Sequence, residues 1–130
     1  GADMSGWIAV DFDGTLATYG TWLGADHMGE PIGPMVDRVK RWLAEGREVR
    51  IFTARVGTSG RPNGAGQSDD EAFAAQQRLQ IQAWCRQHIG RELQVTATKD
   101  FGMVELWDDR AVQVRMNTGE VVGHSTRGLA

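Results

Sequence analysis

The stretch Trp7-Ile8-Ala9-Val10-Asp11-Phe12-Asp13-Gly14 contains the pattern that decides the fold. Four apolar residues in succession predict a strand buried on both faces, because a strand with one exposed face would alternate apolar and polar residues. A polar turn with two carboxylates follows at once. Val104-Glu105-Leu106-Trp107-Asp108-Asp109 repeats this arrangement much later in the chain. Two strands that end in carboxylates predict one acidic site at the carboxyl edge of a sheet.

The rest of the chain predicts an alternation of strands and helices. Periodicity and turn residues predict strands at 48–53 and 93–96, helices at 34–43 and 68–89, and a terminal hairpin from 112–116 and 120–122. Pro34 and Gly46 suit the two ends of the first helix, and Ser68 with Glu71 forms a capping-box pattern at the start of the second. This order predicts an α/β fold: a Rossmann-like, open, mostly parallel sheet with helices on both faces and a C-terminal hairpin.

Glycine-rich segments interrupt this pattern. Residues 15–33 predict an irregular loop, and residues 57–67 have the composition of a mobile loop. Residues 1–3, before Met4, have the character of an expression scar. We therefore expect a single domain over residues 4–125 and a frayed tail over 126–130.

Composition narrows the class of protein. The chain has 130 residues, which suits one domain, and its only cysteine is Cys85. A single cysteine excludes an intrachain disulfide and a zinc site with paired cysteines. The formal net charge is −3, so no overall basic field attracts nucleic acid or a membrane. Because no apolar run reaches membrane-spanning length and no signal sequence opens the chain, we expect a cytoplasmic protein without a membrane partner.

The carboxylates that follow the two strands carry the chemistry. Asp11 and Asp13 alternate along the chain and can point to the same side, and Asp108 and Asp109 would join them if the strands are neighbours. Mutual repulsion among these groups would be costly without a cation. The oxygen-only ligand set suits Mg²⁺ better than zinc, whose usual nitrogen and sulfur ligands are missing.

Four segments, in order, resemble the motifs of the haloacid-dehalogenase-like (HAD) hydrolases. Residues 10–16, Val-Asp-Phe-Asp-Gly-Thr-Leu, resemble the first motif, and residues 51–55, Ile-Phe-Thr-Ala-Arg, resemble the second. Lys99 is a candidate for the third, and residues 106–110, Leu-Trp-Asp-Asp-Arg, resemble the fourth. The resemblance implies a HAD-like fold, and the short gaps between motifs imply a small member without a cap domain.

The resemblance also implies roles for these residues. Asp11 would be the nucleophile that forms an aspartyl-phosphate, Asp13 the general acid and base, and Thr53 and Lys99 would hold phosphoryl oxygens. Gly14, Thr53, Ala54, Arg55 and Lys99 would form the substrate-binding set. Mg²⁺ would bind to Asp11, the Asp13 carbonyl and Asp108, with Asp109 either a ligand through water or an orienting group.

Taken together, the motifs predict a Mg²⁺-dependent phosphatase. It would hydrolyse phosphomonoesters, with nucleotide or nucleic-acid end phosphates preferred, because an open site and the Asp-Asp-Arg motif resemble nucleic-acid end phosphatases. The expected assembly is a monomer or a weak homo-oligomer. Only residues 100–103 separate Lys99 from the strand at 104–107, where many family members have a whole helix, which weakens the assignment of Lys99. A phosphate-binding or regulatory module with little turnover is the alternative, and a receiver-like phospho-acceptor domain fits the motif order less well.

Overall fold

The computed structural model describes residues 5–20, 23–24, 26–58 and 67–126, with residues 67–70 described by their backbone alone. The predicted scar, most of the predicted loop at 57–67 and residues 127–130 of the tail lie outside the described residues. The capping interaction predicted for Ser68 lies outside them as well.

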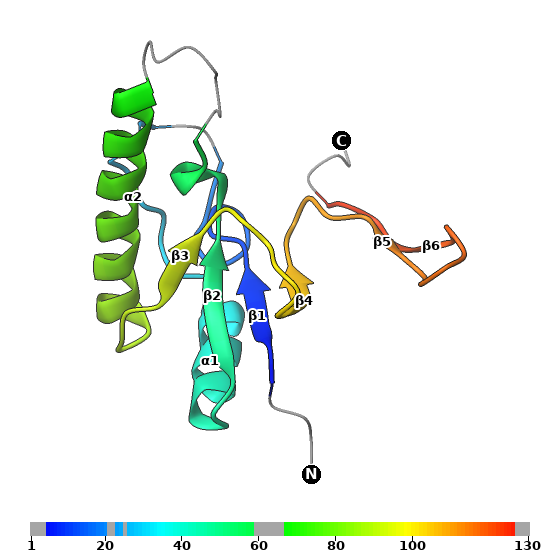
Figure 1. Ribbon diagram of the computed structural model, residues 1–130. Helices are drawn as coiled ribbons and strands as arrows, with labels where there is room; N and C mark the ends of the chain where they lie inside the picture. The colour runs from blue at the N-terminus through cyan, green and yellow to red at the C-terminus, as the bar shows by residue number, and fades with distance from the viewer. Residues whose placement is uncertain (1–4, 21–22, 25, 59–66, 127–130) are drawn as a thin grey trace.

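A four-stranded parallel sheet forms the centre of the molecule (Figure 1). Its strands are β1 (Trp7–Val10), β2 (Glu48–Phe52), β3 (Gln94–Thr96) and β4 (Met103–Trp107), in the order β3-β2-β1-β4. The helices are α1 (Gly33–Ala44), α2 (Gln67–His88) and a short 3₁₀ turn, η1 (Ala54–Val56). The predicted α/β fold with a parallel, Rossmann-like sheet is confirmed.

β1 occupies the interior of the sheet, as its continuous apolar sequence predicts. All four of its residues are buried, and it pairs with β2 on one side and β4 on the other. Val10 is in register with both Ile51 and Trp107, so the residues that follow these strands emerge side by side. The two carboxylate-ended strands are therefore neighbours.

Both helices pack on the same face of the sheet, so the prediction of helices on both faces is wrong. Alternate strand residues and the inner sides of α1 and α2 form one hydrophobic core: Ile8, Val10, Val49, Ile51, Val95, Met35, Val36, Val39, Ala74, Ile81, Trp84, Cys85 and Ile89. Successive strands β1, β2 and β3 step in one direction across the sheet, and right-handed crossovers then place both connecting helices on one side.

Within the described residues, no helix is both long enough and apolar enough to cross a membrane.

A short extended connection replaces the helix that would have covered the second face. Residues 97–102 run from the end of β3 to the start of β4 and cross the sheet in front of β2 (Figure 1). Trp7 anchors this connection: its indole Nε1 donates to Asp100 Oδ1 at 2.8 Å, and the Arg50 guanidinium lies 4.4 Å from its ring centroid. The rest of this face has no helix over it in the described part of the chain.

The predicted terminal hairpin is present but shorter than expected. It consists of β5 (Gln113–Val114) and β6 (Val121–Gly123), which pair antiparallel. Asn117 and Gly119 take positive φ angles of 66° and 76° in the turn, a conformation that these two residue types accept most readily. The hairpin projects away from the sheet (Figure 1).

We expect Gly6→Ala to destabilise the protein far more than Gly90→Ala. Both glycines have positive φ, 85° and 102°, so both substitutions carry a similar backbone cost. A Cβ at Gly6 would lie 2.6 Å from Val104 Cγ1 and 2.7 Å from the Gly102 oxygen, whereas one at Gly90 has open space. Overpacking of this kind adds roughly 1–3 kcal/mol. Urea unfolding of the two variants measures the difference, and equal losses would contradict the close approach of β4 to Gly6.

Candidate active site

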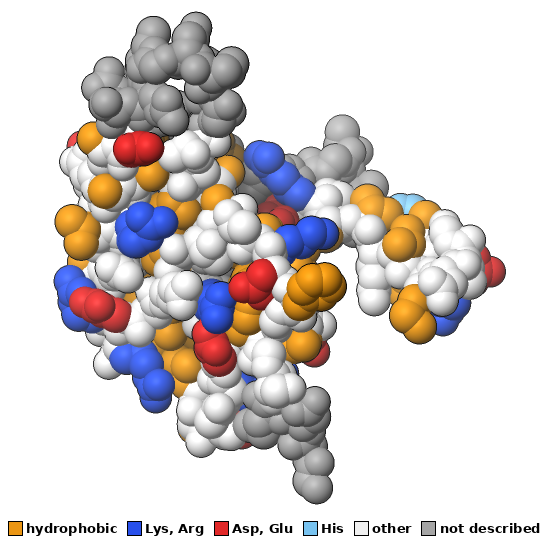
Figure 2. Space-filling view, in the orientation of Figure 1, with side chains coloured by type: hydrophobic (Ala, Val, Ile, Leu, Met, Phe, Trp, Pro, Cys, Tyr) orange, Lys and Arg blue, Asp and Glu red, His pale blue; other side chains and the backbone are white. Residues whose placement is uncertain are grey.

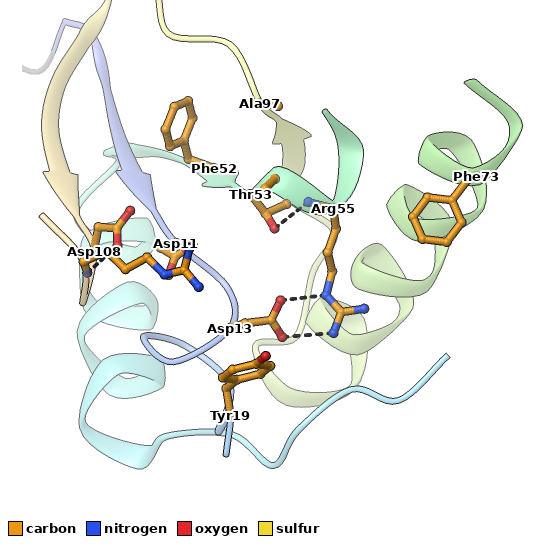
Figure 3. A pocket seen from close by; sticks show the side chains of 11 residues that line it. Asp11, Asp13, Tyr19, Phe52, Thr53, Arg55, Phe73, Ala97 and Asp108 are labelled. Carbon is orange, nitrogen blue, oxygen red and sulfur yellow. Dashed lines mark hydrogen bonds and ion pairs between the residues drawn. The ribbon is translucent and has the colours of Figure 1, made fainter. Parts of the chain in front are cut away.

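An open cavity of about 560 Å³ lies at the carboxyl ends of β1, β2 and β4 (Figure 3). It is lined by Asp11, Asp13, Tyr19, Phe52, Thr53, Ala54, Arg55, Phe73, Ala97, Asp108 and Arg110. Parallel sheets place ligand sites at this edge. The structure therefore brings residues from three of the four quoted motifs to one cavity.

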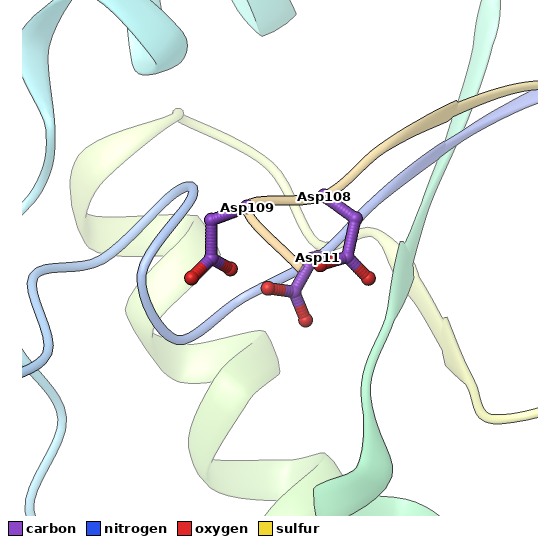
Figure 4. Close-up of side chains that lie close together, drawn as sticks. All are labelled: Asp11, Asp108 and Asp109. Carbon is purple, nitrogen blue, oxygen red and sulfur yellow. The ribbon is translucent and has the colours of Figure 1, made fainter. Parts of the chain in front are cut away.

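Three carboxylates gather beside the cavity, of which Asp11 and Asp108 line it (Figure 4). Oxygens of Asp11, Asp108 and Asp109 all lie within 4.8 Å of one another, and the three side chains are half-buried. The Asp11 N–H donates to the Trp107 carbonyl at 2.9 Å, which continues the pairing of β1 and β4 past the strand ends. This backbone bond fixes Asp11 beside the pair that follows β4.

Thr15 connects Asp11, which follows β1, with Asp109, which follows β4. Its hydroxyl oxygen lies 3.2 Å from Asp11 Oδ2 and 3.2 Å from Asp109 Oδ1, and it accepts from the Asp109 N–H at 3.0 Å. One hydroxyl hydrogen can satisfy only one of the two carboxylates at a time. Sequence reasoning gave Thr15 no role, although it lies within the quoted first motif.

Burial and the neighbouring carboxylates raise the pKa of Asp11 from 3.8 to about 7. Burial is the largest cause, followed by the charge of Asp108 and by the hydrogen bond and charge of Asp109, while the bond from Thr15 acts in the opposite direction. A carboxyl group with this pKa is half-protonated near neutral pH. The three carboxylates offer only oxygen ligands, which suit a hard metal ion. The positive charge of such an ion would offset the repulsion among the carboxylates.

Asp13 lies on the other side of the cavity and belongs to a separate ion pair (Figure 3). Arg55 Nε donates to Asp13 Oδ2 at 2.7 Å, and Arg55 Nη2 donates to Asp13 Oδ1 at 3.0 Å. The guanidinium also donates from Nη1 to Gln77 Oε1 at 2.7 Å and from Nη2 to the His27 carbonyl at 3.1 Å. Arg55 therefore ties Asp13, α2 and the loop after β1 together.

Arg55 reaches this position because the chain turns sharply after β2. Thr53 caps η1: its hydroxyl oxygen accepts from the Arg55 N–H at 3.2 Å. Thr53 is 4% exposed and its N–H donates to the Thr96 carbonyl, which holds the residue at the floor of the cavity. Thr53, Ala54 and Arg55 all line the cavity, and the guanidinium of the buried Arg55 is paired with Asp13.

Two predicted substrate-binding residues lie elsewhere. Gly14 is not among the residues that line the cavity; its φ of 89° permits the turn after β1, and its N–H donates to the Ala17 carbonyl at 2.8 Å. The amide is therefore used inside the loop, and substrate binding by Gly14 stays a prediction. Lys99 is exposed in the connection between β3 and β4 and does not line the cavity, although Ala97 does. Arg110, which sequence reasoning gave no firm role, lines it instead.

Comparison with known proteins finds no family model, no curated protein and no solved structure that matches the chain significantly. The geometry of the cavity and its residues is therefore the basis for a functional proposal.

We expect Asp11→Asn to stabilise the metal-free protein, and to do so only above mildly acidic pH. Because the folded-state pKa is about 7 and the ordinary value is 3.8, the folded state binds the proton more tightly, and ionisation lowers stability progressively as pH rises between these values. Asparagine removes this penalty, so the gain is absent below about pH 4 and complete above about pH 7, on the order of 1–3 kcal/mol after allowance for partial exposure.

Thermal unfolding in the presence of a chelator, as a function of pH, measures this gain. Asp37→Asn, an exposed carboxylate on α1, is the matched control and should show no such pH-dependent gain. A stabilisation of Asp11→Asn that does not change with pH would contradict the raised pKa.

We expect Arg55→Lys to cost on the order of 2–4 kcal/mol, because lysine retains the charge but cannot make the forked contact and leaves Asp13 and Gln77 poorly paired. The Arg55 and Asp13 side chains are only 7% and 20% exposed. Arg110→Lys at an exposed position is the control and should change stability by less than about 0.5 kcal/mol. Chemical denaturation of both variants measures the two losses, and similar values would contradict the anchoring role of Arg55.

Proposed function

We propose that this protein is a Mg²⁺-dependent phosphomonoester hydrolase of the HAD type that acts through an aspartyl-phosphate on Asp11. The observation that supports this most directly is the position of Asp11. It lies at the end of the central strand, with Asp108 and Asp109 on one side, and opens onto a cavity that also contains Asp13 and Thr53.

Asp11, Asp108 and Asp109 are the residues that would hold the metal ion, with the Asp13 carbonyl as a further oxygen donor. When bound, Mg²⁺ supplies positive charge that offsets the repulsion in the cluster and the charge of a substrate phosphate. Burial is the largest cause of the raised pKa of Asp11, and the charges of Asp108 and Asp109 add to it. Thr15 orients Asp11 and Asp109 toward each other through its hydroxyl.

Asp11 would act as the nucleophile. Its carboxylate oxygen forms a bond to phosphorus while the ester P–O bond breaks, and the leaving oxygen takes a proton from Asp13. A water molecule then attacks the phosphorus of the aspartyl-phosphate, gives its proton to Asp13, and releases inorganic phosphate with Asp11 restored. Splitting one displacement into two easier ones is the advantage of the covalent route.

Arg55 would position Asp13 for both proton transfers. The two hydrogen bonds from Arg55 fix the plane of the Asp13 carboxylate where it lines the cavity. Because Arg55 is itself fixed by Gln77 and the His27 carbonyl, Asp13 is held by a rigid support. This support makes Arg55 a positioning residue in the proposed reaction.

The phosphoryl oxygens would be held on the β2 side of the cavity. Thr53 accepts from the Arg55 N–H, so its own O–H can donate to an oxygen of the substrate. Lys99 is the proposed cation for the same group, although its side chain is exposed outside the cavity lining, and it would have to turn inward from the connection that Ala97 begins. Arg110 already lines the cavity beside Asp108.

The open cavity suits a substrate that extends beyond the phosphate. Tyr19 and Phe73 line it and are 40% and 44% exposed, so they offer aromatic surface near the phosphate position. Bases stack on such surfaces with little dependence on sequence. We therefore place nucleotide and nucleic-acid end phosphates first among the candidate substrates.

Release of inorganic phosphate from a panel of phosphomonoesters tests the proposal. The panel includes mononucleotides and 3′- and 5′-phosphorylated oligonucleotides, with and without Mg²⁺. We expect Mg²⁺-dependent release that Asp11→Asn abolishes, because asparagine is not a nucleophile toward phosphorus. Asp37→Asn, which is remote from the cavity, should retain full activity. Unchanged turnover in Asp11→Asn would exclude the covalent role.

A second prediction concerns the phosphate-binding lysine. We expect Lys99→Ala to lower kcat/KM on the order of 10²–10³-fold, as loss of a group that stabilises the transition-state charge does. Lys40 is the only other lysine, exposed on α1, and Lys40→Ala is the matched control. Steady-state kinetics on the best substrate of the panel measures both. If the two variants are equally active, Lys99 does not hold the phosphoryl group.

A phosphate-binding module with little turnover is the second candidate function. The exposed position of Lys99 favours it, because a site without that charge near phosphorus could bind a phosphate ligand and turn it over slowly. Mg²⁺-dependent binding of a nucleotide, measured by calorimetry, without phosphate release would support this alternative over the hydrolase.

A further inference from the structure

We propose that two copies of this chain associate by reciprocal exchange of the C-terminal hairpin, each hairpin docking on the uncovered face and edge of the partner's sheet. The proposal concerns a surface outside the cavity and does not depend on the function proposed above. It rests on two apolar surfaces that the fold leaves exposed on the same molecule.

The first surface is the open side of β4. β4 is an edge strand of the sheet, and no other strand pairs with its outer edge in the described part of the chain. Val104 is 54% exposed, Leu106 is 41% exposed, and Phe101 in the preceding connection is fully exposed. Leu106 is in register with Ala9, so it lies on the face that α1 and α2 do not cover. The six-residue connection before β4 is the reason that no helix covers this face.

The second surface is the hairpin itself, residues 111–124, which we call the arm. Its exposed apolar side chains are Val112, Val114, Met116, Val121 and Val122. Arg115 and Glu120 pair with each other at 3.1 Å, so these two charges on the arm offset one another. A two-stranded hairpin is marginally stable by itself in water and needs a surface to pack on. Figure 2 shows the arm standing apart from the body of the molecule, with hydrophobic side chains on the visible side.

A groove joins the two surfaces. It has a volume of about 670 Å³ and lies between β4 and the base of the arm, with Val104, Leu106 and Val112 in its lining beside Glu105, Asp108 and His124. The base of the arm is fixed, because Ser125 Oγ and the Thr126 N–H both donate to the Asp109 carbonyl. The arm is therefore held out from the sheet at a defined root, and the groove beside it is open to an extended segment from another molecule.

The exposed apolar area sets an upper limit on the interface, and this limit is close to what a standard dimer buries. With ordinary side-chain sizes, the exposed fractions of the eight apolar residues of the two surfaces correspond to on the order of 900 Å² per copy, against about 800 Å² per partner in a standard interface. The largest apolar patch on a typical monomer is about 300–600 Å². A second copy supplies both surfaces at once, and two-fold symmetry then buries each arm and each open face together.

Charge favours this exchange over direct pairing of two β4 edges. Glu105 is the middle residue of β4, and antiparallel pairing of β4 with its own copy about that residue would place two carboxylates opposite each other. Like charges in that position are destabilising. An arm that enters the groove brings valines and a methionine to Val104 and Leu106 instead.

Sedimentation velocity across the micromolar range tests the proposal. We expect the unmodified protein to be a dimer at high concentration, and Val114→Asp in the arm to weaken the association at least tenfold. Leu79→Asp on α2 is the matched control, since Leu79 is 67% exposed but lies outside both surfaces, and it should leave the dimer intact. A monomer at all concentrations overturns the proposal, as does equal dissociation of the two variants. Circular dichroism confirms that each variant is folded.

Crosslinking distinguishes exchange from other dimers. Val104→Cys protein is mixed with Val114→Cys protein under mild oxidation; the buried Cys85 is common to both. We expect the mixed disulfide between the two variants to exceed either self-crosslink. A dominant Val104→Cys self-crosslink would show pairing of β4 edges and overturn the exchange. Phosphate release by Val114→Asp, measured in parallel, separates this question from the proposed function, because association and activity can fail independently.

Discussion

Backbone pairing between β1 and β4 brings Asp11 beside Asp108 and Asp109, and the repulsion among these three carboxylates is the constraint around which the rest of the site is arranged. Burial and neighbouring charge raise the pKa of Asp11 to about 7. Three acidic groups at the ends of two neighbouring strands cost folding free energy when no cation is bound. This repulsion is relieved when the three carboxylates share a ligand of opposite charge.

On the opposite side of the cavity, an aspartate is paired with a positive charge. Asp13 follows Asp11 by two residues, yet it lies outside the acidic cluster because the turn after β1 directs it toward Arg55. The buried guanidinium satisfies Asp13, Gln77 and the His27 carbonyl together. Two aspartates from one short motif therefore have different surroundings, one crowded by negative charge and one paired with a positive charge. In the proposed reaction, a bound cation would favour the ionised form of Asp11, and Arg55 would hold the Asp13 carboxylate in place.

The short connection between β3 and β4 has consequences on both sides of the sheet. Six residues are too few for a crossover helix, so the second face receives Trp7, Arg50 and the connection itself in place of a helix. Because the connection is short, Lys99 is exposed in it, and no helix covers Leu106 and Val104. The open face and the position of the candidate lysine thus have one structural origin.

The sequence by itself determined the secondary structure and the parallel sheet, because continuous apolar strands, helical periodicity, Pro34 and Gly46 are local signals that tertiary packing reinforces. It also placed the aspartates that follow the two strands at one carboxyl edge, whereas the pairing of β1 with β4, which brings Asp11 beside Asp108 and Asp109 and leaves Asp13 apart, is seen only in the tertiary structure. Only the tertiary structure decided which face the helices cover, because handedness of the crossovers acts between strands and leaves no local pattern. It also decided the partners of Arg55, Thr15 and Gly14, since each depends on the three-dimensional path of a turn and on residues distant in the chain.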